Sequence, residues 1–181
     1  GSPWILPSLL VSSVPFGAST HINTGAEKSR VVVATRKDLR DRSSKIVGDH
    51  VQKVLETGLE NLYQTKSSVI WKTLFSKNDV VGLKVNCLAG RGLSTSIELV
   101  DAIIVNLLQA GVQKHHIIIW DRLDRDLVSA GFDIYQGRNK PQCYGNDKVG
   151  YTTDIYEFGA VGSLLSRILV DQCTAVINLP V

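Results

Sequence analysis

The segment Asp79–Glu98 constrains the fold of this chain more than any other stretch of its sequence. A short apolar run is followed by a loop with two glycines and then by a hydroxyl-rich helix start, which is how a buried strand is joined to its covering helix. Lys84 and Asn86 stand near the end of the apolar run, where a central strand is normally apolar. Because open α/β sheets bind ligands at the carboxyl ends of their strands, the sequence predicts a polar site there.

Composition restricts the class of protein. The chain has 181 residues, of which 44% are hydrophobic and 20% charged, values typical of an ordinary globular protein with one core. The net charge of +3 is small, and the Lys and Arg residues are scattered and are not interleaved with aromatics. We therefore expect no nucleic-acid partner. The apolar stretches are too short for a membrane span.

The cysteines and histidines show no metal-binding pattern. Cys87, Cys143 and Cys173 are far apart and form no Cys-x-x-Cys pair. His115 and His116 are adjacent, so in a strand they point to opposite faces. We expect no metal site, and the sequence leaves any cofactor unknown.

The N-terminal region has the features of a processed leader. Gly1-Ser2 is typical of a tag-removal scar, and Trp4–Ala18 is apolar, uncharged and followed by a polar linker. Such a segment resembles the core of a secretory signal, which predicts an exported or periplasmic protein. The alternative is an N-terminal arm that packs on the domain or on a neighbouring molecule. We assign residues 1–29 to scar, arm and linker, and residues 30–181 to a single domain.

The C-terminal region predicts a truncated domain. Cys173–Val181 is an apolar, β-branched run without a polar tail or a closing helix. The end of such a strand needs cover, so we expect its partner to be a missing C-terminal portion or a second copy that associates through the apolar ends.

Apolar spacing predicts strands alternating with helices. Strands are expected at residues 30–35, 79–86, 116–120 and 174–179. Helices are expected at residues 47–62, 67–75, 97–110, within 121–130 and at 161–169, and residues 133–157 are expected to form an excursion with a small hairpin. This order indicates a three-layer α/β fold, with an open, mainly parallel sheet and helices on both faces in a Rossmann-like order.

Cap residues are expected at the helix ends. Ser43 or Ser44 is expected to cap the first helix. Thr95 and Glu98 have the spacing of a capping box, and Gly111 is expected to end that helix.

Lys84 has two interpretations. An unpaired ammonium is costly to bury, so Lys84 needs a carboxylate, an anionic ligand or a route to solvent. It is either a lysine at the end of a strand that reaches water or a functional group that pairs with a ligand.

The loop after this strand also has two interpretations. It has neither the Lys of a P-loop nor the spacing of a dinucleotide fingerprint. Its backbone N–H groups, hydroxyls and arginine make it a candidate anion site, with Cys87 as either a reactive or a packed thiol. In the alternative, the glycines only shape a tight turn and Thr95 caps the helix. The candidate ligand-binding residues of this loop are Gly90, Arg91, Gly92, Ser94, Thr95 and Ser96.

Two further polar residues are expected at the same edge. Asp121 directly follows an apolar strand, and in neighbouring strands it would meet Lys84 and set its charge state. In the alternative, Asp121 belongs to a solvated turn and Asp124 caps the next helix. Asn178 repeats the pattern in the last strand. We therefore propose Lys84 and Asp121 as catalytic candidates, with Asn86 and Asn178 as ligand contacts.

Several of these segments resemble a known family. Segments of the "domain of unknown function 362" proteins are similar to Asp79–Asn86, Gly90–Thr95, Glu98–Ile103, Ile117–Arg122, Glu157–Gly159 and Ile177–Val181. The resemblance implies an uncharacterised bacterial protein that is often exported and associated with iron–sulfur chemistry. The chain departs from the family pattern at Ser96, where similar loops have His, and it has no cluster-binding cysteines.

Two functional hypotheses follow. The first is an anion or small-ligand site on an enzyme, and the family resemblance implies a link to redox chemistry. The second is a non-catalytic binding or assembly module, whose polar strand ends face a missing portion or a partner.

Overall fold

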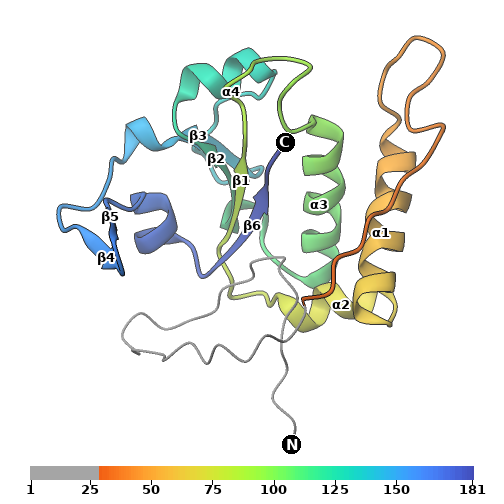
Figure 1. Cartoon of the computed structure of the whole chain (residues 1–181), viewed down its shortest axis with the longest axis horizontal. Helices are drawn as coiled ribbons and strands as arrows, with labels where there is room; N and C mark the ends of the chain where they lie inside the picture. The colour runs from red at the N-terminus through yellow and green to blue at the C-terminus, as the bar shows by residue number, and fades with distance from the viewer. Residues whose placement is uncertain (1–28) are drawn as a thin grey trace, which may run out of the picture.

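The computed structural model describes residues 29–181, and its centre is a four-stranded sheet (Figure 1). The strand order is β3-β2-β1-β6, and every pair of neighbours is parallel. The strands are β1 (Val81–Val85), β2 (Ile117–Asp121), β3 (Gln142–Gly145) and β6 (Ala175–Leu179). The predicted α/β class with a parallel sheet is confirmed. All four carboxyl ends therefore lie at one edge.

Helices and short turns fill the connections. Within residues 29–181 the α-helices are α1 (Gly48–Tyr63), α2 (Ser67–Leu74), α3 (Ile97–Ala110) and α4 (Asp124–Ala130). Short helical turns occur at Lys114–His116, Asn146–Lys148 and Ile168–Gln172, the last of π type, and a separate hairpin pairs β4 (Tyr156–Phe158) with β5 (Val161–Ser163). This hairpin lies almost entirely after residues 133–157, where a small hairpin was expected, so the predicted position of the hairpin is wrong.

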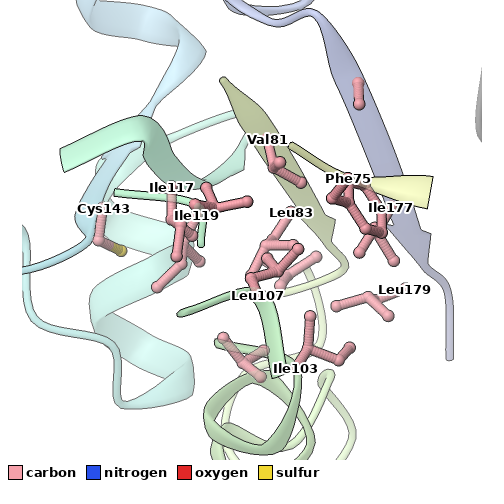
Figure 2. Close-up of a cluster of buried hydrophobic side chains, with 14 of the residues drawn as sticks. Phe75, Val81, Leu83, Ile103, Leu107, Ile117, Ile119, Cys143, Ile177 and Leu179 are labelled. Carbon is pink, nitrogen blue, oxygen red and sulfur yellow. The ribbon is translucent and has the colours of Figure 1, made fainter. Parts of the chain in front are cut away.

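The sheet has a different apolar cluster on each face, because successive strand residues point to opposite sides. On one face, Leu83 meets Leu107 and Ile103 of α3 in the main core (Figure 2). On the other face, Trp120 packs with Ile168 of the π-helical turn in a smaller cluster. Helical segments therefore cover both faces, as a three-layer α/β fold requires, but one face is covered much more thinly.

The prediction of a strand at residues 30–35 is wrong. This segment is extended and runs beside α1, but it joins no sheet (Figure 1). The backbone of residues 30–37 makes no hydrogen bond to the described part of the chain. Ala34 instead packs against Gly58 of α1. A β-branched run favours extended backbone, but it does not supply the neighbouring strand that a sheet needs.

Two predictions in the C-terminal third are also wrong. The excursion contains β3, whose short Gln-Cys-Tyr-Gly sequence has little apolar signal and is recruited by pairing with β2. The helix predicted at residues 161–169 is replaced by β5 and the π-helical turn. Val161 and Leu164, which define its apolar spacing, are exposed.

The predicted N-terminal caps are wrong, whereas the predicted C-terminal cap is confirmed. Helix α1 follows Val47, and Ser43 and Ser44 belong to a turn in which the Asp41 carboxylate accepts from the Ser43 amide and hydroxyl. Helix α3 is capped by Ser96 and not by Thr95, because the Thr95 hydroxyl is used elsewhere. Gly111 ends α3 with a φ of 102°, as its left-handed cap position requires.

The predicted scar and signal-like arm lie outside the described residues, so export stays a prediction. Within residues 29–181, no helix combines the length and the apolarity that a bilayer crossing needs.

A substitution at Gly82 tests the thinly covered face. A Cβ at this position would lie 2.7 Å from Cys173 Sγ and 3.1 Å from Trp120 Nε1. We expect Gly82→Ala to lower the free energy of unfolding by about 1–3 kcal/mol, because the packed neighbours must shift. Gly48→Ala is the matched control, since nothing lies within 4 Å of its added Cβ. Urea denaturation measures both, and equal stabilities would contradict the packing described here.

Candidate functional site

Lys84 and Asp121 form an ion pair at the carboxyl edge of the sheet. Strands β1 and β2 are neighbours, and their register places Lys84 opposite Trp120, one residue before Asp121. The ammonium Nζ lies 2.8 Å from Asp121 Oδ1. The prediction that these two residues meet is confirmed, and Asp121 is not part of a solvated turn.

The Asp121 carboxylate is buried, with 7% of the residue exposed. Its Oδ2 accepts from the Cys87 amide at 2.7 Å, and its Oδ1 accepts from the Arg122 amide at 2.8 Å. With the ammonium, these donors compensate the cost of removing the carboxylate from water. Asp121 therefore joins the start of the glycine loop to the end of β2.

Lys84 is paired but remains accessible. Its ammonium also donates to the Val85 carbonyl and lies 5.6 Å from the centre of the Trp120 ring. An ammonium has three N–H donors, and the described residues accept from two of them. Since 32% of the side chain is exposed, the third donor is available to a ligand or to water. Trp120 was not predicted as part of this site, although its position directly before Asp121 in the sequence could have indicated that it lies there.

The hydroxyls of the glycine loop bond within the loop or to neighbouring strands. Ser94 Oγ donates to the Gly90 carbonyl at 2.6 Å, and Ser96 Oγ accepts from the Leu99 amide at 3.3 Å. Gly90 and Gly92 have φ values of 71° and 95°, which favour glycine. The Ser94 and Ser96 hydroxyls therefore bond within the loop and its helix, which agrees with the interpretation of this loop as a tight turn.

Thr95 connects the ends of two strands. Its Oγ1 accepts from the Asn86 amide at 2.9 Å and donates to the Leu179 carbonyl at 2.7 Å. The Thr95 amide donates to the Asn86 carbonyl at 3.0 Å. The predicted capping role of Thr95 is wrong, and its hydroxyl stabilises the edge that carries Lys84. The sequence contains no signal for this role, because Leu179 is 84 residues away.

The loop keeps several unused backbone donors. The amides of Arg91, Gly92 and Ser94 make no hydrogen bond to residues 29–181. The Arg91 side chain lies elsewhere: its Nη2 is 3.0 Å from the position of a Cβ on Gly131, at the end of α4. The structure therefore places Arg91 against α4 and offers loop amides, rather than loop hydroxyls, to an anion.

Asn178 lies beside Lys84, and Asn86 follows the same strand. Asn178 is the register partner of Lys84 across β1 and β6, so their side chains share a face of the sheet. Both asparagines are exposed, and within the described part of the chain their amide side chains have no hydrogen-bond partner. The structure thus brings Lys84, Asp121 and Asn178 together as predicted.

Asp124 does not cap α4. The cap position is Leu123, and Asp124 Oδ1 accepts from the Gly145 amide at 2.5 Å. Asp124 therefore connects α4 to β3, and it does not belong to the Lys84 edge.

The cysteines are packed thiols. Burial, together with the nearby Asp121 charge, raises the pKa of Cys87 to about 12. Burial also raises the pKa of Cys143 and of Cys173 to about 12. The structure therefore favours the packed-thiol interpretation of Cys87. In the part of the chain described, no group of three or more His, Cys, Asp or Glu side chains could hold a metal ion.

These features define a three-layer α/β domain with an accessible ion pair at the carboxyl edge of a parallel sheet. Compared with family models, curated proteins and solved structures, the chain matches none of them. The resemblance noted in the sequence therefore stays a prediction.

Substitutions test whether Asp121 contributes more to the stability of the fold than Lys84 does. We expect Asp121→Ala to lower the free energy of unfolding by about 3–5 kcal/mol, because it leaves a buried amide and an ammonium without their acceptor. Lys84→Ala should cost about 1–2 kcal/mol, because two amides still solvate the carboxylate. Lys77→Ala is the surface control, expected within about 0.5 kcal/mol of the parent. Urea denaturation distinguishes them, and a larger loss for Lys84→Ala would contradict this order.

The raised pKa values of the thiols predict slow alkylation of the folded protein. With a pKa of about 12, only about one Cys87 thiol in ten thousand is ionised at pH 8. Iodoacetamide should therefore label the protein in urea but not the native protein, as measured by mass spectrometry. Equal labelling rates in water and in urea would contradict the packing of the thiols.

The same thiols predict a pH dependence of stability. Because folding raises the pKa values of Cys87 and Cys143 from 9.0, the free energy of unfolding should fall as the pH rises above about 9.

Proposed function

We propose that this domain binds a small anionic ligand at the carboxyl edge of its sheet, with Lys84 as the cationic contact. The single observation that carries the proposal is the third N–H donor of Lys84, which remains available on an accessible edge while Asp121 holds the ammonium in place. A charged donor already fixed in position loses little side-chain entropy when it binds a ligand.

Polar groups around Lys84 support this proposal. The exposed amide of Asn178 lies across the sheet from it, and Asn86 follows it at the end of β1. The unused amides of Arg91, Gly92 and Ser94 form the adjacent loop. Such amides are suited to the oxygen atoms of a phosphate or a carboxylate.

In the enzymatic form of the proposal, Lys84 contacts the substrate and Asp121 is a positioning residue. Asp121 accepts a hydrogen bond from the Lys84 ammonium and limits its motion, so Lys84 is suited to contact and orient a negatively charged group of the substrate. The redox link and membership of the "domain of unknown function 362" family rest on the sequence resemblance alone. Export to the periplasm is likewise part of the proposal and rests on the apolar segment Trp4–Ala18.

A second candidate is a non-catalytic assembly surface at the same edge. Leu88 and Leu93 of the glycine loop are 72% and 70% exposed, next to the polar strand ends. Exposed leucines around polar groups are a feature of protein interfaces. In this candidate the Lys84–Asp121 pair orders the loop, and a second copy or a further portion of the protein covers it.

Phosphate titration tests the first candidate. We expect inorganic phosphate to bind with a dissociation constant on the order of millimolar, seen as amide shifts in the Cys87–Ser96 loop by NMR. Lys84→Gln should weaken binding about tenfold or more, because it removes a charged hydrogen bond. Lys77→Gln makes the same charge change in an exposed turn and should bind like the parent. The proposal fails if no loop amide shifts, or if both variants lose affinity equally.

Light scattering tests the second candidate. If the edge is an assembly surface, the parent chain should form dimers, and Leu88→Ser with Leu93→Ser should return it to a monomer. Phosphate binding should survive these substitutions, because neither side chain contributes a polar group. A parent that stays monomeric at high concentration would remove self-association as the function of this edge.

A further inference from the structure

A cavity lies along α1, and neither Lys84 nor Asp121 lines it. Its volume is about 450 Å³, within the range of small-molecule sites. One wall is formed by the segment 30–46, which we call the arm and which differs from the N-terminal arm predicted within residues 1–29. In Figure 1 its first part runs beside α1 and the rest loops back into the start of that helix. The apolar lining includes Val32 and Ile46 of the arm, Val54, Leu55 and Leu62 of α1, and Leu99 of α3.

The cavity extends along most of α1 because of the apolar spacing of that helix. Its lining residues recur at helical spacing from Val51 to Leu62, a distance of about 16 Å at 1.5 Å per residue. Val51 and Leu59 are buried, but Val54, Leu55 and Leu62 are only partly covered. The apolar stripe of α1 is therefore wider than the surface the arm covers. Gly58 has no side chain at the middle of this stripe, and Ala34 of the arm lies over it, 3.5 Å from the position of a Cβ on Gly58.

The arm is held mainly at its two ends. At one end, Arg30 Nη1 donates to the Leu62 carbonyl at 3.3 Å. At the other, the Val47 amide donates to the Leu39 carbonyl at 3.0 Å, and His50 Nδ1 lies 2.5 Å from the Asp38 carbonyl. Between them, the backbone of residues 30–37 has no hydrogen bond to the described residues. A ligand can therefore enter by displacing the arm without breaking a hydrogen-bonded ladder.

The charge at one end of the cavity indicates the chemistry of the ligand. Arg30 lines the cavity and forms no ion pair within residues 29–181. Its guanidinium has five N–H donors, of which the Leu62 carbonyl accepts one. A cation at the end of an apolar cavity that extends along a helix matches a linear alkyl chain that ends in a carboxylate.

We propose that this cavity binds a fatty acid, with its alkyl chain along α1 and its carboxylate at Arg30. Eleven helical steps correspond to an extended chain of about dodecyl length. This site is independent of the anion site at Lys84, so either proposal can fail without the other.

Calorimetry on the full 181-residue chain, with octanoate, decanoate and dodecanoate as probes below their micellar concentrations, tests this proposal. We expect the affinity to rise about tenfold for each two-carbon step, because each methylene buries further apolar surface. Gly58→Leu should abolish binding by filling the floor, whereas Gly48→Ala, with open space around its Cβ, should bind like the parent. Absence of binding, or binding that Gly58→Leu leaves intact, overturns the proposal.

Further variants test the carboxylate contact and the apolar space separately, and they distinguish a loss of binding from a failure to fold. Arg30→Gln should weaken dodecanoate about tenfold and leave dodecanol unchanged, and equal effects on both would overturn the carboxylate assignment. If Gly58→Leu does not fold, as judged by circular dichroism, Ala34→Leu fills the same space from the arm. If the parent is a dimer that Ala34→Leu dissociates, a second copy is the occupant and the ligand proposal fails. It also fails if binding appears only after residues 3–18 are removed, because the chain itself would then cover the cavity.

Discussion

The buried carboxylate of Asp121 is the interaction on which the carboxyl edge of the sheet depends. It accepts from the Cys87 amide, from the Arg122 amide and from the Lys84 ammonium, so one side chain connects β1, β2 and the glycine loop. The two amides only partly compensate the cost of burying this carboxylate, and the ammonium supplies the third donor and the opposite charge. This requirement explains why a lysine is found near the end of an otherwise apolar strand.

The Lys84 edge and the cavity along α1 differ in their physical character. At the edge, polar groups lie at the ends of rigid parallel strands, which favours precise contacts with a small charged ligand. Along α1, an arm with few backbone hydrogen bonds lies over a wide apolar stripe, which favours a flexible apolar ligand. The two sites draw on different elements of the fold, and their proposed ligands share only a negative charge.

The glycine loop shows that one segment serves two purposes. Its hydroxyls stabilise the loop: Ser94 bonds to Gly90, Ser96 caps α3, and Thr95 joins the ends of β1 and β6. The backbone amides of Arg91, Gly92 and Ser94 make no hydrogen bond within residues 29–181 and are the groups that the proposed anion would contact. Hydroxyl-rich loops before helices are often interpreted as anion sites through their side chains, but here the side chains maintain the shape that presents the backbone.

The sequence by itself determined the elements whose signal is local. Strand β1 was predicted from its apolar run, and helix α3 from its apolar spacing and from Gly111 at its end. The contact between Lys84 and Asp121 was predicted because each residue lies at the end of an apolar run. Only the tertiary structure decided the features that depend on distant partners. Gln142–Gly145 became a strand because β2 offered an edge, whereas residues 30–35 found none and packed on α1. Thr95 bonds to Leu179 rather than to its own helix. The physical reason is that helix periodicity and turn residues act within a few positions, whereas strand pairing and side-chain hydrogen bonds are chosen among groups brought together by the whole fold.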